Sequence, residues 1–328
     1  MAARKLSERQ QRIAKARQAS QREKLSHGEN GDESELRTGR VVSNYGKRLI
    51  VEDELGRLID CHFRQNLGAI VCGDKVVWRP EGDGTGTVVA LEPRSSLLVR
   101  PQRHGKPRPV AANIDQLLVT SAPVPPLDTR LLDRYLVAAR LLGIDAGIVV
   151  NKWDLATTDL REELEDKLAV YRQIGYPLFF TSTRKDIGLA PLAAQLRDHT
   201  SIFVGLSGVG KSSLINALVP DAELRIGAIS EASRQGRHTT TTARLYHLPE
   251  GGDVIDSPGV REFGLWEITP REASQGFVEF DPFVSQCRFR DCRHQQEPGC
   301  AVREAVESGQ IDAQRYQSYL QILNGTGN

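Results

Sequence analysis

The sequence predicts an α/β protein: a mostly parallel sheet with an all-β barrel before it and a small α-helical unit after it. Three observations predict this. Five short β-like runs crowd into residues 38–92, apolar strands alternate with amphipathic helices over residues 111–270, and three cysteines and a histidine gather in residues 271–328. Strand–helix alternation is typical of a parallel sheet with helices on both faces.

Length and composition indicate a globular protein of about two domains or more, at roughly 150 residues each. Its 328 residues carry 43 Lys and Arg against 42 Asp and Glu, so the whole chain is not a polycation. No apolar run reaches the roughly 18 residues of a membrane span, and the N-terminus lacks the apolar core of a secretion signal. Five cysteines, an odd number, disfavour a disulfide framework. We therefore expect a cytoplasmic location and no membrane partner.

The N-terminal residues 1–37 are predicted to be a basic flexible arm and linker. Residues 1–27 hold eight Lys and Arg against two Glu, with too few apolar residues for a core-facing stripe. The following residues 28–37 are acidic and rich in small polar residues. Such a segment either binds a polyanion or is a solvated tail without a partner.

Residues 38–92 are predicted to form an OB-fold barrel, because five short strands follow one another with turn residues between them. Such barrels often bind oligonucleotides, which suggests RNA. The connector at residues 93–110 is rich in proline and carries five basic residues and no acid. It is either a phosphate-contacting surface or an exposed linker.

Strands and helices then alternate through the central domain. Apolar strands are predicted at residues 114–122, 146–151, 177–182 and 201–207, followed by shorter ones at 243–249 and 253–257. Helices are predicted at residues 128–143, 159–175, 188–198 and 210–218. In the first helix, Asp128 is placed as N-cap and Gly143 lies just past the end.

A phosphate-binding loop fits the pattern G-x-x-x-x-G-K-[ST] between a predicted strand and a predicted helix. Its residues are Gly205, Leu206, Ser207, Gly208, Val209, Gly210, Lys211 and Ser212, and Ser213 follows. Backbone N–H groups and the helix N-terminus would bind phosphate oxygens. Lys211 would reach the β- and γ-phosphates, and Ser212 would bind Mg²⁺.

Three further motifs follow predicted strands. Asp256 and Gly259 form D-x-x-G, in which the carboxylate can hold Mg²⁺ and the glycine N–H can approach the γ-phosphate. Asn151, Lys152 and Asp154 form N-K-x-D, whose carboxylate can accept two N–H groups of guanine. Adenine would leave that charge unpaired, so the site should discriminate between the bases. A loop that supports the base is predicted at Ser182 and Thr183.

The order of these motifs carries a resemblance. The guanine motif comes first, then the base-supporting loop, then the phosphate loop and D-x-x-G. This order resembles the circularly permuted GTPases, and the chain is most similar to the bacterial ribosome small-subunit-dependent GTPase A family. The resemblance implies an OB-fold barrel, a circularly permuted P-loop GTPase domain and a zinc-binding C-terminal domain. It also implies GTP hydrolysis on the small ribosomal subunit, with its rRNA as partner and late maturation as the step.

The first switch is expected between the phosphate loop and Asp256, in the segment that holds four consecutive threonines. Thr240 is our choice for covering Mg²⁺ and the γ-phosphate. Val260 stands where many GTPases place the glutamine that orients water. His238 is the nearest polar substitute, and the resemblance implies a switch histidine. The alternative is a surface histidine on a loop. The switch after Asp256 runs directly into the C-terminal domain, so nucleotide-driven movement could be passed on.

A structural zinc site is predicted from C-x₄-C-x-H-x₅-C, and it matches the resembled family's C-terminal motif. The four ligands are Cys287, Cys292, His294 and Cys300. Three thiolates and one imidazole complete a tetrahedron and leave no position for substrate. Interleaved Arg288, Arg290 and Arg293 suit rRNA phosphate. The alternative is three buried free thiols and a hydrogen-bonded histidine.

Three functions remain open at this point. The main one is a monomeric GTPase, with Mg²⁺ and one Zn²⁺, whose hydrolysis the small ribosomal subunit stimulates. The second is a GTP-gated RNA-binding placeholder, and the third is a signalling GTPase with a protein partner. Steep salt dependence of RNA binding would distinguish the first two from the third.

Overall fold

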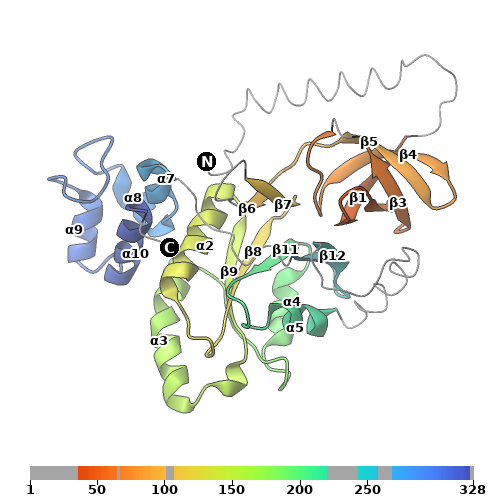
Figure 1. Ribbon diagram of the computed structural model, residues 1–328. Coiled ribbons are helices and arrows are strands. Elements are labelled where there is room, and N and C mark those ends of the chain that lie inside the picture. The colour runs from red at the N-terminus through yellow and green to blue at the C-terminus, as the bar shows by residue number, and fades with distance from the viewer. Residues whose placement is uncertain (1–35, 65–66, 101–106, 220–242, 258–267, 326–328) are drawn as a thin grey trace.

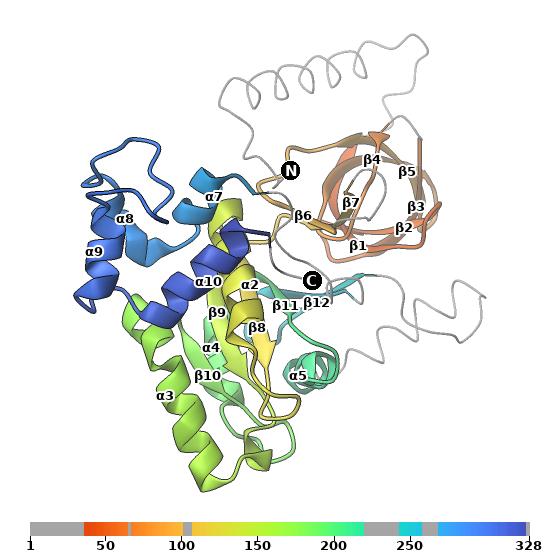
Figure 2. The same cartoon turned by 60° about the vertical axis from the view of Figure 1, so that its left-hand side comes forward.

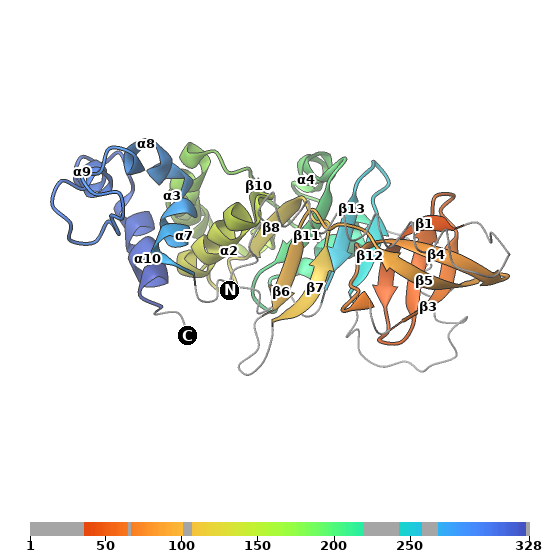
Figure 3. The same cartoon turned by 90° about the horizontal axis from the view of Figure 1, so that it is seen from above.

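The computed structural model describes residues 36–64, 67–100, 107–219, 243–257 and 268–325 (Figure 1). It confirms the predicted order of a barrel, an α/β sheet and a helical C-terminal unit. Seen from above, the barrel lies at one end of the molecule and the C-terminal helices at the other, with the α/β sheet between them (Figure 3). The predicted basic arm lies, up to residue 35, outside the described residues.

The barrel is closed, as an OB-like fold requires (Figure 2). Its strands are β1 (Arg37–Asn44), β2 (Leu49–Asp53), β3 (Leu58–Phe63), β4 (Lys75–Gly82) and β5 (Thr85–Leu91). They pair in the order β1-β2-β3-β5-β4, and β4 returns to pair with β1. Only the β3–β5 pair is parallel. Trp78 and Cys61 are buried in the interior.

The connector contains a hairpin that the sequence did not reveal. β6 (Leu97–Arg100) pairs with β7 (Arg108–Ala112) in a separate antiparallel sheet. Leu98 is buried, and the Ala112 N–H donates to the carbonyl of Cys72 at 2.9 Å. The prolines led us to expect a linker, because proline argues against a central strand. Proline is nevertheless compatible with an edge strand at a position that needs no N–H donor.

The central sheet has the order β10-β9-β8-β11-β13-β12. Its strands are β8 (Gln116–Ser121), β9 (Asp145–Val150), β10 (Leu178–Phe180), β11 (Thr200–Val204), β12 (Arg244–His247) and β13 (Asp253–Asp256). All pairs are parallel except β12–β13. The barrel joins this sheet where Ser43 of β1 pairs with Arg244 of β12.

Helices cover both faces of the sheet, as predicted. α2 (Thr129–Leu142) and α3 (Thr158–Ile174) pack on one face, against Leu117 and Val119. α4 (Leu189–Leu196) and α5 (Lys211–Leu218) pack on the other, against Leu118. Alternate residues of one strand thus point to opposite cores. The expected caps of α2 are present: Asp128 accepts two backbone N–H groups, and Gly143 has φ +69°.

The C-terminal unit is helical. It comprises α7 (Pro270–Gln275), the 3₁₀ turn η4 (Val278–Phe280), α8 (Asp281–Val284), α9 (Ala301–Glu307) and α10 (Ala313–Leu323). Phe277, Phe280 and Tyr319 form its core together with Val137 of α2, so the unit shares a core with the central domain. An aromatic and aliphatic stripe of α10 packs in this core, formed by Tyr316, Tyr319, Leu320 and Leu323. Within the described ranges, no helix is long and apolar enough to cross a membrane.

Candidate nucleotide site and metal site

The predicted nucleotide-site motifs converge at one edge of the central sheet. Asn151 follows β9, Thr181 follows β10, Gly205 follows β11, and Asp256 ends β13. These strands are parallel, so their carboxyl ends lie together, which is where open α/β sheets bind ligands. Sequence segments more than 100 residues apart therefore form one site.

The phosphate loop joins β11 to α5 and needs its glycines. Gly205 has φ +135°, and a Cβ there would lie 2.0 Å from the carbonyl oxygen of Thr120. Gly210 has φ +93°, and a Cβ there would meet the Asn151 Nδ2 at 2.3 Å. Larger residues would push the loop away from both neighbours. Between these glycines, Leu206, Ser207 and Gly208 are exposed, and so are Ser212 and Ser213 of α5.

Two lysines bond to carbonyls of the phosphate loop. The Lys211 Nζ donates to the carbonyls of Gly205 at 2.8 Å and Leu206 at 2.6 Å. The Lys152 Nζ donates to the carbonyl of Gly208. Both cations therefore already lie over the loop whose N–H groups are predicted to bind phosphate.

The guanine motif is hydrogen-bonded to the phosphate loop. The Asn151 Nδ2 donates to the carbonyls of Val209 at 3.0 Å and Gly210 at 3.4 Å. The Thr181 hydroxyl donates to the Asn151 Oδ1 at 3.2 Å. Asn151 thus connects the phosphate loop with the loop after β10. The residue is buried, at 1% exposure. Its side chain holds the two halves of the site together.

The carboxylate of Asp154 lies in the 3₁₀ turn η2 (Trp153–Leu155) and accepts a hydrogen bond from the Ser182 hydroxyl. The Ser182 Oγ in turn accepts the Lys185 N–H at 3.2 Å. Thr183 follows, partly exposed. The structure therefore brings the two predicted base-reading loops together. His238, Thr240 and Gly259 lie outside the described residues.

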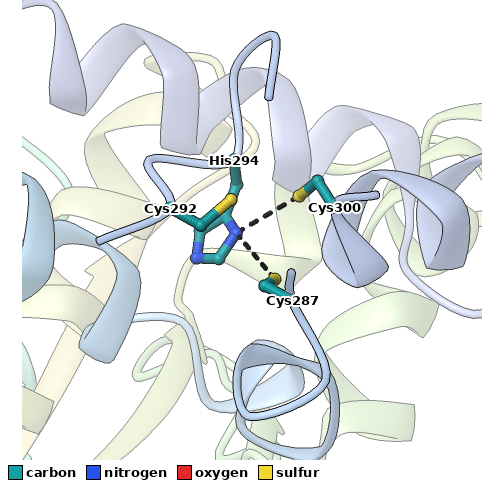
Figure 4. A group of neighbouring side chains, drawn as sticks. All are labelled: Cys287, Cys292, His294 and Cys300. Atoms are coloured by element: carbon teal, nitrogen blue, oxygen red, sulfur yellow. Dashed lines mark hydrogen bonds between the residues drawn. The ribbon is translucent and has the colours of Figure 1, made fainter. Parts of the chain in front are cut away.

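The metal site brings together the four predicted ligands (Figure 4). The ligand atoms of Cys287, Cys292, His294 and Cys300 all lie within 4.8 Å of one another. The His294 Nδ1 is 3.6 Å from the Cys287 Sγ and 3.4 Å from the Cys300 Sγ. Burial raises the pKa of the Cys292 thiol to about 12. Three sulfurs and one nitrogen converging on one point can hold a metal ion.

A second layer of hydrogen bonds fixes the His294 ring. The Ser274 Oγ of α7 lies 3.0 Å from the His294 Nε2, so Nδ1 is the nitrogen that faces the thiols. The Tyr316 hydroxyl donates to the carbonyl of His294. Glu297 accepts the backbone N–H groups of Arg293 and Gln295, each at 2.9 Å. Backbone hydrogen bonds lower the pKa of this carboxyl to about 2, despite its partial burial.

Comparison with known proteins agrees with this geometry. The family model described as RsgA GTPase matches residues 91–266. A Chromohalobacter salexigens protein named small ribosomal subunit biogenesis GTPase RsgA is 53% identical, over 90% of this chain and 88% of its own. The chain belongs to the RsgA GTPase family. It is therefore a GTP-hydrolysing enzyme.

Two solved structures support the fold. The crystal structure of YjeQ from Thermotoga maritima has a TM-score of 0.74 and 34% identity, covering 88% of this chain and 98% of that one. YloQ, described as a circularly permuted GTPase, has a TM-score of 0.71 and 28% identity, covering 90% and 97%. The permuted order predicted for this RsgA-family chain is thus confirmed.

Sequence reasoning missed several residues around both sites of this RsgA-family enzyme. Ser274 and Glu297 support the metal ligands, and Arg161 contacts the guanine motif. The turn Glu297-Pro298-Gly299 is a weak local signal for an ordered loop. Ser274 and Arg161 have no short-range pattern with their partners, so nothing in the sequence indicated them.

Proposed function

We propose that this RsgA-family GTPase binds the small ribosomal subunit, acts in its late maturation, and hydrolyses GTP faster when bound. The observation that carries the guanine-nucleotide part is the bonding of Asn151 to both the phosphate loop and the base-supporting loop. The subunit is proposed from the printed name of its relatives.

In this proposal the site residues keep their predicted roles. Asp154 reads guanine, with Asn151, Lys152, Ser182 and Thr183 holding its loop. The phosphate loop from Gly205 to Ser213 binds the phosphates, together with Gly259. Magnesium is bound by a set of oxygen ligands: Ser212, Thr240 and Asp256. Lys211 offsets the charge that develops on the phosphates, and Thr240 would cover the γ-phosphate, because positioning and electrostatics dominate phosphoryl transfer. His238 is proposed to position water.

The metal is proposed to be one structural zinc ion. A Cys₃His donor set is typical of zinc, and four protein ligands leave no coordination position for substrate. When bound, zinc would neutralise the thiolates and connect the loop at residues 287–300 to α9.

The RNA-contacting surface is proposed to include the loop at residues 287–300 that carries the metal ligands, the barrel and the β6–β7 hairpin. Arg288, Arg290 and Arg293 are exposed, and none of them has an ion-pair partner in the described part of the chain. Phe289 is exposed, and the Arg288 guanidinium lies over its ring, with the Arg288 Cζ 5.6 Å from the ring centroid. Arginine and an aromatic ring suit phosphates and unstacked bases. We propose that the protein acts there as a monomer in the cytoplasm.

The test measures GTP hydrolysis by the full chain with small subunits, with large subunits, or with neither. Stimulation by small subunits alone is expected, and it should be lost in Lys211→Ala. Equal rates in all three conditions would reject ribosome coupling and favour a signalling GTPase with a protein partner. Tighter RNA binding with a non-hydrolysable GTP analogue, but no stimulation, would favour the placeholder function.

A further inference from the structure

We propose that Arg161 is a positioning residue for guanine recognition, which holds the peptide that carries Asp154. It does so through Trp153, the variable residue of the N-K-x-D motif. The inference rests on the proposed assignment of Asn151 and Asp154 to the guanine base.

Arg161 contacts Trp153 in two ways. From the first turns of α3, its Nη2 donates to the carbonyl oxygen of Trp153 at 3.2 Å. Its Cζ also lies over the indole, 5.5 Å from the ring centroid. That carbonyl belongs to the peptide that joins Trp153 to Asp154. A hydrogen bond there fixes the direction in which the chain enters Asp154, without neutralising the Asp154 carboxylate.

Trp153 in turn connects the two base-reading loops. Its ring is 7% exposed and packs on Phe180 at the end of β10, with the centroids 4.3 Å apart. The backbone N–H of Trp153 donates to the carbonyl of Thr181 at 2.9 Å. Arg161, Trp153 and Phe180 therefore form one cluster, which the Trp153–Thr181 backbone bond joins to the residue before Ser182, and the Ser182 hydroxyl bonds to Asp154. Movement of this cluster would shift both loops.

Two signs of strain suggest that this arrangement serves a purpose beyond stability. The Arg161 Nε is buried and has no hydrogen-bond partner among the described residues. Lys152, just before Trp153, has the left-handed φ of +58°. Unpaired buried atoms and such backbone angles cost free energy and persist where the surrounding structure holds them. Here both border the residue that is proposed to read the base.

The experiment compares GTP with inosine triphosphate. Inosine lacks the exocyclic amine, so it offers Asp154 one N–H group where guanine offers two. The measured quantity is the dissociation constant for inosine triphosphate divided by that for GTP. In Arg161→Ala we expect this ratio to fall by roughly threefold to tenfold, the loss expected for one weakened charged hydrogen bond. KM for GTP should rise while kcat stays near its original value, because the phosphate site is unchanged.

Two further variants define the controls. Arg172→Ala removes an exposed arginine from the other end of α3 and should leave the ratio unchanged. Arg161→Lys keeps a cation and a donor but loses the planar contact with the indole, so it should restore the ratio in part. It also gives the same test if Arg161→Ala does not fold, as thermal unfolding would show.

The outcomes separate this inference from the proposed function. An unchanged ratio in both Arg161 variants, with a reduced ratio in Asp154→Asn, would overturn the role of Arg161 alone. An unchanged ratio in Asp154→Asn would overturn the base-site assignment itself. A reduced ratio in Arg161→Ala and Asp154→Asn, but not in Arg172→Ala, supports the inference.

Discussion

The two ends of the central domain are joined to their neighbours by charge clusters of similar composition. At the barrel end, His247 of β12 lies between Glu52 of β2 at 2.8 Å and Asp253 of β13 at 2.6 Å. At the C-terminal end, Arg315 of α10 lies between Asp133 of α2 and Glu279 of η4. Each cluster places a basic group between two acids, and at the barrel end Arg40 of β1 also pairs with Asp253.

Burial makes the two clusters different. The His247 side chain is 40% exposed, whereas the Arg315 and Asp133 side chains are 1% and 0% exposed. Burial opposes the charge of Arg315, but Asp133 and Glu279 outweigh it and raise its pKa further. The Arg315 guanidinium also stacks on Phe277, 4.6 Å from the ring centroid. A buried ion pair is costly to break but an exposed one is not, so the C-terminal end should be the firmer attachment.

Removing the metal should have the largest effect. It tests how far the buried Arg315 cluster keeps the C-terminal unit folded without the metal. Chelation should remove the free energy that metal binding supplies, about 10 kcal/mol or more for a structural zinc site, and the single change Cys292→Ser should remove part of it. Amide hydrogen exchange should then speed up in α9, and metal analysis should show less bound metal, which we propose to be zinc. The strands β1–β5 serve as an internal control with unchanged exchange. Full metal content in Cys292→Ser would contradict the proposed ligand set.

Breaking the buried cluster should have the next largest effect. Arg315→Ala leaves Asp133 and Glu279 without their cation, and loss of one partner of a buried pair costs about 3–5 kcal/mol. Urea unfolding monitored through the C-terminal unit measures it. As a matched control, Arg303→Ala removes an exposed pair with Glu307 and should cost less than about 1 kcal/mol. Equal losses in both variants would mean that burial does not distinguish them.

The exposed cluster should give the smallest effect, and one that depends on pH. Hydrogen bonds to Asp253 and Glu52 raise the pKa of His247 from 6.5 to about 9. The same histidine and Arg40 lower the pKa of Asp253 on balance, although burial opposes this. Protonated His247 therefore stabilises the fold fully below pH 6.5, and the stabilisation is lost as pH rises through about 9.

We expect His247→Ala to lower the free energy of unfolding by at most about 1 kcal/mol at pH 6, and by less at pH 9.5, since solvent screens this half-exposed group. Denaturant unfolding at the two pH values measures the difference. Arg197→Ala, which breaks the exposed pair with Glu250, should show no such dependence, because arginine keeps its charge. A His247 contribution that is equal at both pH values would assign the titration to another group.

The comparison also separates what the sequence could predict from what it could not. The caps of α2, the phosphate loop and the metal ligands were predicted, because each depends on residues close together in the chain. The partners of Arg315 lie 182 and 36 residues away, so helical periodicity showed only the aromatic stripe beside it. Leu98 in the connector is likewise buried by distant segments, whereas Arg161 and Trp153 are only eight residues apart but belong to different helical elements, so no single helical period relates them. Contacts between distant segments set the burial of a charge, and local patterns do not report them.

The predicted movement of the C-terminal unit with the nucleotide state stays a prediction. The segment from residue 258 to 267, which would start it, lies outside the described residues. The two ends of its possible path are described: Asp256 ends β13, and Ser274 of α7 contacts the metal ligand His294. The Arg315 cluster fixes α10 to α2, so any such movement would have to leave that contact intact.

The permuted order also sets the sequence in which the site is synthesised. β8, α2, β9, α3 and β10 form a continuous βαβαβ unit that is complete at Phe180, and it carries the base-reading loop. β11 and the phosphate loop come later, when β11 pairs with the edge of β8, and β13 then pairs with β11. If the proposed site residues bind nucleotide, a growing chain makes the base-reading half of that site first and the phosphate loop only with β11 and α5. The complete proposed site then exists only in chains that have been made past the middle of the protein.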